Sequence, residues 1–322
     1  MKRILKTLAV MAVIFAAVFL VFRTSDTQVS EMKAKYGGVP SQFVTLPNGQ
    51  QIHLRDEGPT NAPAIILLHG SSSDLHTWEP WVQALKSDYR VIRYDQIGHG
   101  LTGPSIAESY ELADFTGDVG RVADHLDLET FVLAGNSMGG WISAGYALEH
   151  PERLKGLVLL DASGSPVKRP ENSGGNIGFT IAATPGLNNI MKHITPRSLV
   201  KQSLEQSVSV KAVATDEAVD RYWEMLRYPG NRAATIARFN TQRVTYDAEQ
   251  IGGLNVPTLI LWGTEDALVP VEAGRWYDEH LPSSTLIEYD GIGHLPMEEA
   301  PEKSANDLKN WLVNAVFKQE TP

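Results

Sequence analysis

Residues 135–139 read Gly-Asn-Ser-Met-Gly and lie where the pattern of the sequence changes. Residues 131–134 before them form an apolar run typical of a buried strand, and residues 138–150 have the pattern of a helix that ends at Pro151. A strand, a tight turn and a helix with Gly-x-Ser-x-Gly at the corner form a nucleophile elbow. The glycines avoid collisions where the strand and the helix approach closely, and the turn exposes the serine hydroxyl. Ser137 is therefore predicted to be a catalytic nucleophile.

A serine nucleophile needs a base, and His294 is the predicted base. This histidine lies in a loop between a strand predicted at 285–289 and a helix predicted at 298–317. Gly291 and Gly293 in the same loop allow the chain to bend the imidazole ring back over the sheet.

The base in turn needs a carboxylate that orients it, and two aspartates are candidates. Asp266 follows an apolar run at 258–262, and Asp161 ends another at 157–160, so either side chain could reach the far nitrogen of the base. A residue in a loop beyond a strand is placed to reach across the sheet. Asp266 is therefore the predicted acid, with Glu265 as the adjacent alternative, and Asp161 is expected to cap the following turn.

Two N–H donors are expected to hold the oxyanion that forms during acyl transfer. The backbone N–H of Met138, at the start of the helix after the elbow, is the first predicted donor. The second is the backbone N–H of Ser71, in the loop after the apolar run 65–68. The same loop also reads as a polar turn that leads into a helix predicted at 77–86, and both roles are compatible.

Other chemistries are less well supported by the sequence. Residues 95–100 read Asp-Gln-Ile-Gly-His-Gly, which lacks the lysine and the glycine spacing of a phosphate loop. A structural loop in which Asp95 hydrogen-bonds backbone groups is predicted there instead. No two histidines and a carboxylate share the spacing of metal ligands, so neither a metal nor another cofactor is predicted.

Short apolar strands alternate with helical patterns along most of the chain, which predicts an α/β fold with a doubly wound, mostly parallel sheet. Ligands bind at the carboxyl ends of the strands in such a sheet. The alternation stops in residues 163–254, which begin with a Gly/Ser/Pro-rich stretch and continue with helical pattern. We predict a helical cap there, inserted between the two parts of the core at 41–162 and 255–322.

The N-terminus predicts a membrane anchor. Lys2 and Arg3 precede a stretch, 4–22, that is just long enough to span a bilayer, which takes about 17–25 residues. No Ala-x-Ala-like site follows Phe22, so an uncleaved signal anchor is expected in 1–22, a tether in 23–40, and the body outside the cytoplasm, either periplasmic or extracellular. Secretion after cleavage of a signal peptide is the alternative.

The composition of the chain excludes some classes of partner and of chemistry. The formal net charge of −10 argues against a nucleic-acid partner, and the absence of cysteine excludes a thiolate nucleophile and lipoprotein attachment. The predicted partners are a small-molecule substrate and, through the N-terminal helix, the membrane.

Five motifs occur in an order that resembles the α/β-hydrolase fold superfamily, over about residue 40 to the end of the chain. They are His69-Gly70, Asp95-x-x-Gly98-His99-Gly100, Gly135-x-Ser137-x-Gly139-Gly140, Trp262-Gly263-x-x-Asp266 and Gly293-His294-x-Pro296-x-Glu298. The resemblance implies the same nucleophile, acid and base, and a lid at residues 163–254.

The elbow is also similar to that of carbon–carbon hydrolases that act on ring-cleavage products, although residues 71–73 are serines where those enzymes carry a glycine-rich run. The predicted function is a membrane-anchored serine hydrolase, a carboxylesterase on small or medium acyl esters. The alternatives are a carbon–carbon hydrolase or cofactor-free perhydrolase at the same site, and a non-catalytic receptor that uses the fold to bind a ligand.

Overall fold

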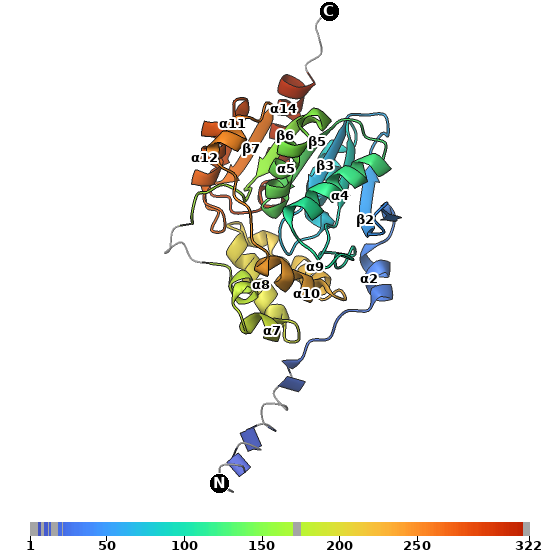
Figure 1. The fold of residues 1–322 in the computed structure, drawn as a ribbon, viewed down its shortest axis with the longest axis vertical. Helices are drawn as coiled ribbons and strands as arrows, with labels where there is room; N and C mark the ends of the chain where they lie inside the picture. Colours follow the sequence, from blue (N-terminus) through green and yellow to red (C-terminus); the bar gives the residue numbers. More distant parts are fainter. Residues whose placement is uncertain are drawn as a thin grey trace, which may run out of the picture.

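The computed structural model describes residues 22–169 and 175–317, together with residues 6, 7, 10, 11, 13, 19 and 20. Its centre is an eight-stranded sheet (Figure 1) in the order β1-β2-β4-β3-β5-β6-β7-β8. Strands β1 and β2 form an antiparallel hairpin, β2 pairs antiparallel with β4, and the other neighbours are parallel, which confirms the predicted mostly parallel sheet. The strands are β1 (Ser41–Thr45), β2 (Gln51–Glu57), β3 (Ala64–Leu68), β4 (Arg90–Tyr94), β5 (Phe131–Asn136), β6 (Leu154–Leu160), β7 (Thr258–Gly263) and β8 (Ser284–Tyr289).

Helices cover both faces of the sheet, which is why its central strands are apolar throughout. In β3, Ile65 and Leu67 pack in one core cluster and Ile66 and Leu68 in the other, because successive side chains point to opposite faces. The first cluster is covered by η1 (Leu75–Trp78), α3 (Glu79–Leu85) and α14 (Pro301–Trp311), and the second by α4 (Leu112–His125), α5 (Met138–Glu149) and α12 (Val271–His280).

The chain between β6 and β7 contains helices and, in its described residues, no strand. In Figure 1 these helices lie together below the carboxyl ends of the sheet strands, and we call α6 to α10 the cap. They are α6 (Ile177–Ala183), α7 (Leu187–Met191), α8 (Arg197–Ser207), η3 (Lys211–Val213), α9 (Asp216–Leu226) and α10 (Asn231–Asn240), and α11 (Ala248–Gly252) then leads back to the core.

The end of the chain differs from the single helix predicted at 298–317. A short helix α13 (Pro296–Glu299) comes first, Ala300 leaves helical geometry at φ −136° and ψ 55°, and α14 begins at Pro301. Proline disfavours the helical conformation in the residue before it, so the break has a local cause. The last turn, η4 (Leu312–Val316), is π-helical, and a one-turn η2 (Pro151–Arg153) precedes β6.

Part of the predicted tether packs on the cap. Helix α2 (Val29–Tyr36) buries Met32 against Met225 of α9, and Asp26 forms an ion pair of 2.6 Å with Arg232 of α10. Across the described residues, we find no helix with both the length and the apolar composition to cross a bilayer. Most of residues 1–22, which carry the predicted anchor, lie outside the described residues, so the anchor stays a prediction.

Candidate active site

Ser137 lies between β5 and α5 in a strained conformation, with φ 55° and ψ −113°. A non-glycine residue in this region costs about 1–3 kcal/mol and persists only where its surroundings fix it. Here the Ser137 N–H donates to the Leu160 carbonyl at 2.9 Å, and its own carbonyl accepts from the Ser163 N–H at 3.0 Å. The turn predicted from the sequence is therefore present, and its strain is held by the end of β6.

The glycines on either side of Ser137 are required by close backbone contacts. A Cβ on Gly135 would lie 2.2 Å from the carbonyl atoms of Gly139, and a Cβ on Gly139 would lie 2.2 Å from the Leu68 carbonyl oxygen. Neither contact can be relieved by rotating a side chain, because both partners are backbone. Gly135 therefore allows the tight turn between β5 and α5, and Gly139 allows that turn to lie against the end of β3.

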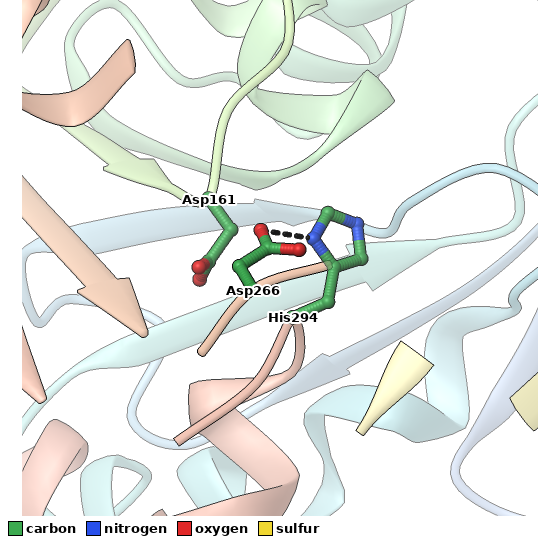
Figure 2. A group of neighbouring side chains, drawn as sticks. All are labelled: Asp161, Asp266 and His294. Carbon is green, nitrogen blue, oxygen red and sulfur yellow. Dashed lines mark hydrogen bonds and ion pairs between the residues drawn. The ribbon is translucent and has the colours of Figure 1, made fainter. Parts of the chain in front are cut away.

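His294 and Asp266 lie side by side at the carboxyl ends of β8 and β7. The His294 Nδ1 and the Asp266 Oδ2 are 2.6 Å apart (Figure 2), and both side chains are buried. The other carboxylate oxygen accepts the N–H groups of Leu268 and Val269 at 2.7 and 3.1 Å, which fixes the direction of the carboxylate. The structure therefore brings the predicted acid and base into hydrogen-bond contact and leaves the Nε2 of the imidazole free of that contact.

The nucleophile and the base are connected through Asn136, which sequence reasoning did not identify. Its Nδ2 donates to the His294 carbonyl at 3.0 Å and to the Leu160 carbonyl at 3.3 Å. Among the described residues, no hydrogen bond joins the Ser137 hydroxyl to His294. Catalytic hydrogen bonds are often long before substrate binds, so this geometry is compatible with a general base.

Glu299 is a second residue that the sequence did not reveal. Its carboxylate accepts the N–H groups of Gly293 and Leu295, on either side of the base, at 3.1 and 3.0 Å. It also accepts those of Ser209 and Val210 after α8, at 2.7 and 2.9 Å. One buried carboxylate therefore fixes the loop of the base and attaches it to the cap.

Asp161, the other candidate acid, lies next to Asp266 but makes no hydrogen bond to His294 in the described structure (Figure 2). Burial, and then the charge of Asp266, raise the pKa of Asp161 well above its ordinary value. The sequence predicted a cap of the following turn, whereas the Asp161 Oδ1 accepts the Gly263 N–H at 3.0 Å and so braces β7. The contacts favour Asp266 as the partner of the base.

Asp161, Asp266 and His294 are also residue types that bind metals, and one potential ligand atom from each lies within 4.8 Å of the others. Metal binding requires deprotonated carboxylates and a free imidazole nitrogen. In this group burial raises the pKa of the Asp161 carboxyl, and the near nitrogen of the imidazole is hydrogen-bonded to Asp266. The arrangement suits an acid–base pair better than a cation.

Both predicted oxyanion donors adjoin the nucleophile. Met138 is the first residue of α5, where backbone N–H groups have no acceptor within the helix. On the other side, a Cβ on Gly70 would lie 3.2 Å from the Ser137 Cβ, so the loop that carries Ser71 packs directly against the elbow. The residues that carry both predicted donors therefore lie beside the nucleophile.

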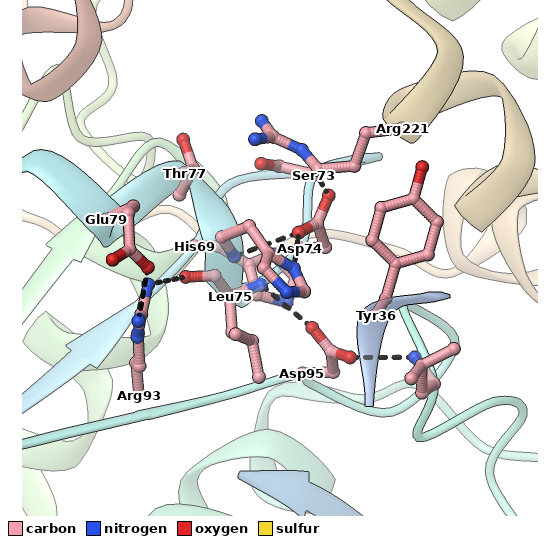
Figure 3. A network of polar contacts seen from close by, with 12 residues as sticks. Tyr36, His69, Ser73, Asp74, Leu75, Thr77, Glu79, Arg93, Asp95 and Arg221 are labelled. Atoms are coloured by element: carbon pink, nitrogen blue, oxygen red, sulfur yellow. Dashed lines mark hydrogen bonds and ion pairs between the residues drawn. The ribbon is translucent and has the colours of Figure 1, made fainter. Parts of the chain in front are cut away.

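The segment after Ser71 is fixed by two buried aspartates (Figure 3). Asp74 caps η1 by accepting the His76 N–H at 2.9 Å, and Asp95 accepts the N–H groups of Leu75 and Leu101 at 2.8 and 2.7 Å. The predicted structural role of Asp95 is thereby confirmed. The loop that carries Ser71 is therefore followed by a segment held in a network of buried hydrogen bonds.

Arg221 of α9 attaches the cap to this network of buried polar residues. Its guanidinium lies 3.2 Å from Asp74 (Figure 3) and 3.6 Å from Glu298 of α13. Although burial opposes ionisation of Asp74, the charges of Arg221 and His76 hold its pKa below the ordinary value. A buried ion pair of this kind is costly to break, because removing one partner leaves the other charge uncompensated.

A pocket begins at the candidate active site and extends into the cap. Ser71, Asn136 and His294 line it at the core. Its other walls are mostly apolar and come chiefly from α6, α8 and the loops beside them, with Phe179, Ala182, Met191, Leu199, Val200, Leu204, Leu226, Leu268 and Leu295.

Comparisons with known proteins agree with this architecture. A 2-hydroxy-6-oxononadienedioate/2-hydroxy-6-oxononatrienedioate hydrolase of Comamonas testosteroni is 27% identical over 288 residues, which cover 85% of this chain and 96% of that relative. The meta-cleavage product hydrolase CumD of Pseudomonas fluorescens IP01 has a TM-score of 0.74 at 22% identity, covering 85% of this chain and 98% of its own. A membrane phospholipase A, described as a bacterial virulence factor, has a TM-score of 0.72 at 23% identity and covers 99% of this chain and 100% of its own.

The two solved structures share the fold of this chain. The model of the alpha/beta hydrolase fold family matches residues 63–301, which include the elbow, the acid, the base and the cap. The chain therefore belongs to the alpha/beta hydrolase fold family.

Proposed function

We propose that this hydrolase is a serine carboxylesterase that cleaves esters of small or medium acyl chains. The observation that carries the proposal is the pocket, which starts at Ser71 and His294 and has mostly apolar walls beyond them. Such walls suit an aliphatic chain, since small-molecule sites are lined mostly by hydrophobic side chains with a few polar groups.

In the proposed reaction, the Ser137 Oγ attacks the ester carbonyl while the His294 Nε2 takes its proton. Asp266 holds the imidazole through Nδ1 and stabilises the imidazolium. The N–H groups of Ser71 and Met138 hold the oxyanion until the carbonyl re-forms and the alcohol leaves with the proton from His294. Water, deprotonated by the same imidazole, then attacks the acyl-enzyme and releases the acid.

The test of this proposal is hydrolysis of p-nitrophenyl esters from acetate to palmitate by the full chain. We expect kcat/KM to rise with chain length up to a medium-chain optimum, because each buried methylene contributes about 0.8 kcal/mol, or about fourfold. Leu204→Phe, which narrows the pocket from α8, should move the optimum to shorter chains. Leu187→Phe, at an exposed position of the same cap, is the matched control and should leave the optimum unchanged.

Cleavage of a carbon–carbon bond is the second candidate, favoured by the relative from Comamonas testosteroni. A vinylogous diketone tested beside the esters distinguishes the two. Turnover of the diketone, with no activity on any ester, would contradict the esterase proposal and support this alternative.

We further place the hydrolase on the outer side of a membrane, anchored by residues 1–22. In support, the likeness to the membrane phospholipase A extends over 99% of this chain. The full chain should stay in the pellet after carbonate extraction of membranes, and a chain that begins at Arg23 should be released. Release of both chains would contradict the anchor.

A further inference from the structure

Arg238 of α10 contacts the side chains of Ser71 and Met138, the two residues whose backbone N–H groups are the predicted oxyanion donors. Its side chain is buried, with 3% of the residue exposed. The Nη1 donates a hydrogen bond to the Ser71 hydroxyl and lies 3.5 Å from the Met138 sulfur. A cation from the cap therefore lies directly behind the oxyanion hole.

Within the part of the chain that the structure describes, this guanidinium has no counter-ion. Its Nε and Nη2 have no hydrogen-bond partner there, and no acidic side chain there lies within ion-pair distance of it. Two other arginines of the cap differ, since Arg221 faces Asp74 and Glu298, and Arg232 pairs with Asp26. Because an unpaired buried charge destabilises a fold, its presence here calls for a function.

The positive charge is retained and acts on the loop of the oxyanion hole. Burial, and then the nearby Arg243, lower the pKa of Arg238 to about 9, whereas Tyr110 opposes them, so the guanidinium stays charged at neutral pH. Burial also lowers the pKa of His69, and the charge of Arg238 adds to that effect. His69 lies two residues before Ser71, so the field of Arg238 reaches the loop that offers the second donor.

We propose that Arg238 is a positioning residue of the oxyanion hole, which fixes the Ser71 loop from the cap and supplies the positive charge that favours the tetrahedral intermediate. The counter-charge of this arginine is then the oxyanion, which exists only during the reaction. Interactions that strengthen only in the transition state raise kcat without tightening substrate binding. The inference rests on the proposed acyl-transfer function.

The inference predicts a loss of rate without a loss of stability. In Arg238→Met, kcat for a p-nitrophenyl ester should fall about tenfold to a hundredfold, less than for removal of a direct oxyanion donor, while KM changes little. The rate at which a fluorophosphonate labels Ser137 should fall by a similar factor, since that reaction also builds negative charge in the hole. The melting temperature should stay the same or rise, because an unpaired buried charge has been removed.

Two further variants of the full chain complete the experiment. Arg238→Lys keeps the charge and should recover most of the lost rate. Lys201→Met makes a comparable replacement at an exposed cation of α8 in the cap and should behave as the parent.

The possible outcomes separate this inference from the proposed function. Unchanged kcat and labelling rate in Arg238→Met, in a parent that labels normally, would overturn the role of Arg238 alone. A lower melting temperature with a raised KM would also overturn it, since that pattern shows a purely structural contact. Normal labelling without ester turnover in the parent would refute the esterase proposal and leave the labelling rates to decide the role of Arg238. A parent that is not labelled would overturn both.

Discussion

Replacing Ser137 with alanine is expected to lower kcat/KM for a p-nitrophenyl ester by at least about a thousandfold, the scale seen when a triad nucleophile is removed. The methyl group of alanine fits the same space in the elbow, so the fold should be kept while the attacking oxygen is lost. Steady-state kinetics of the full chain, with a fluorophosphonate label as a second readout, measures the effect.

Ser143→Ala is the matched control for this variant. Ser143 lies in the same helix, α5, is fully buried, and donates to the Gly139 carbonyl. It should keep activity close to that of the parent. If Ser137→Ala kept the activity, the nucleophile would be misassigned. If the folded parent were neither active nor labelled, a non-catalytic receptor would become the better interpretation.

Asp266→Asn is expected to lower kcat by about ten-thousandfold, as replacement of a triad aspartate by asparagine does elsewhere. The amide nitrogen can no longer accept the Nδ1 proton, so the imidazole adopts the wrong tautomer and its protonated form loses its counter-charge. The kcat for a good ester, measured with enough enzyme to detect slow turnover, is the readout.

Asp161→Asn, its close neighbour, provides the comparison. Asparagine is nearly isosteric with aspartate and can still accept the Gly263 N–H through its amide oxygen. Its activity should stay within about tenfold of the parent, far above that of Asp266→Asn. If Asp161→Asn lost far more activity than Asp266→Asn, Asp161 would be the catalytic acid.

The main features of the fold and the triad candidates follow from patterns that are local in the sequence. Each parallel strand is a short apolar run, and the residue that follows it lies at the carboxyl edge of the sheet. Ser137, Asp266 and His294 could therefore be placed near one another from the order of these runs alone. The hydrogen bond of 2.6 Å between the last two agrees with that placement.

The supporting contacts could not be predicted in this way, because they join segments that are far apart in the sequence. Arg238 and Ser71 are separated by 167 positions, and Asn136 and His294 by 158. Nothing local to an arginine on a cap helix shows whether it faces solvent or an oxyanion loop. The break before Pro301 is different, since the proline was a visible signal for it.

Helix α2 shows how tertiary contacts can order a polar segment. Its sequence is too short and too polar to form a stable helix by itself. The helix is held by Met32 against the cap and by an ion pair of 2.7 Å between Lys35 and Glu224. These partners are nearly two hundred residues away, so a flexible tether was the better prediction from sequence.

The contacts of Glu299 limit how this enzyme can exchange molecules with its surroundings. Its carboxylate binds the loop of the base and the end of α8 at the same time, so a cap that lifted as one rigid lid would also release His294. His294 would therefore not be held in its catalytic position while such a lid is open. We expect molecules to pass instead by local motion of segments that Glu299 does not contact, such as α6 and α7, which contribute Phe179 and Met191 to the pocket wall. Substrate could then enter and product leave while the loop of His294 stays fixed.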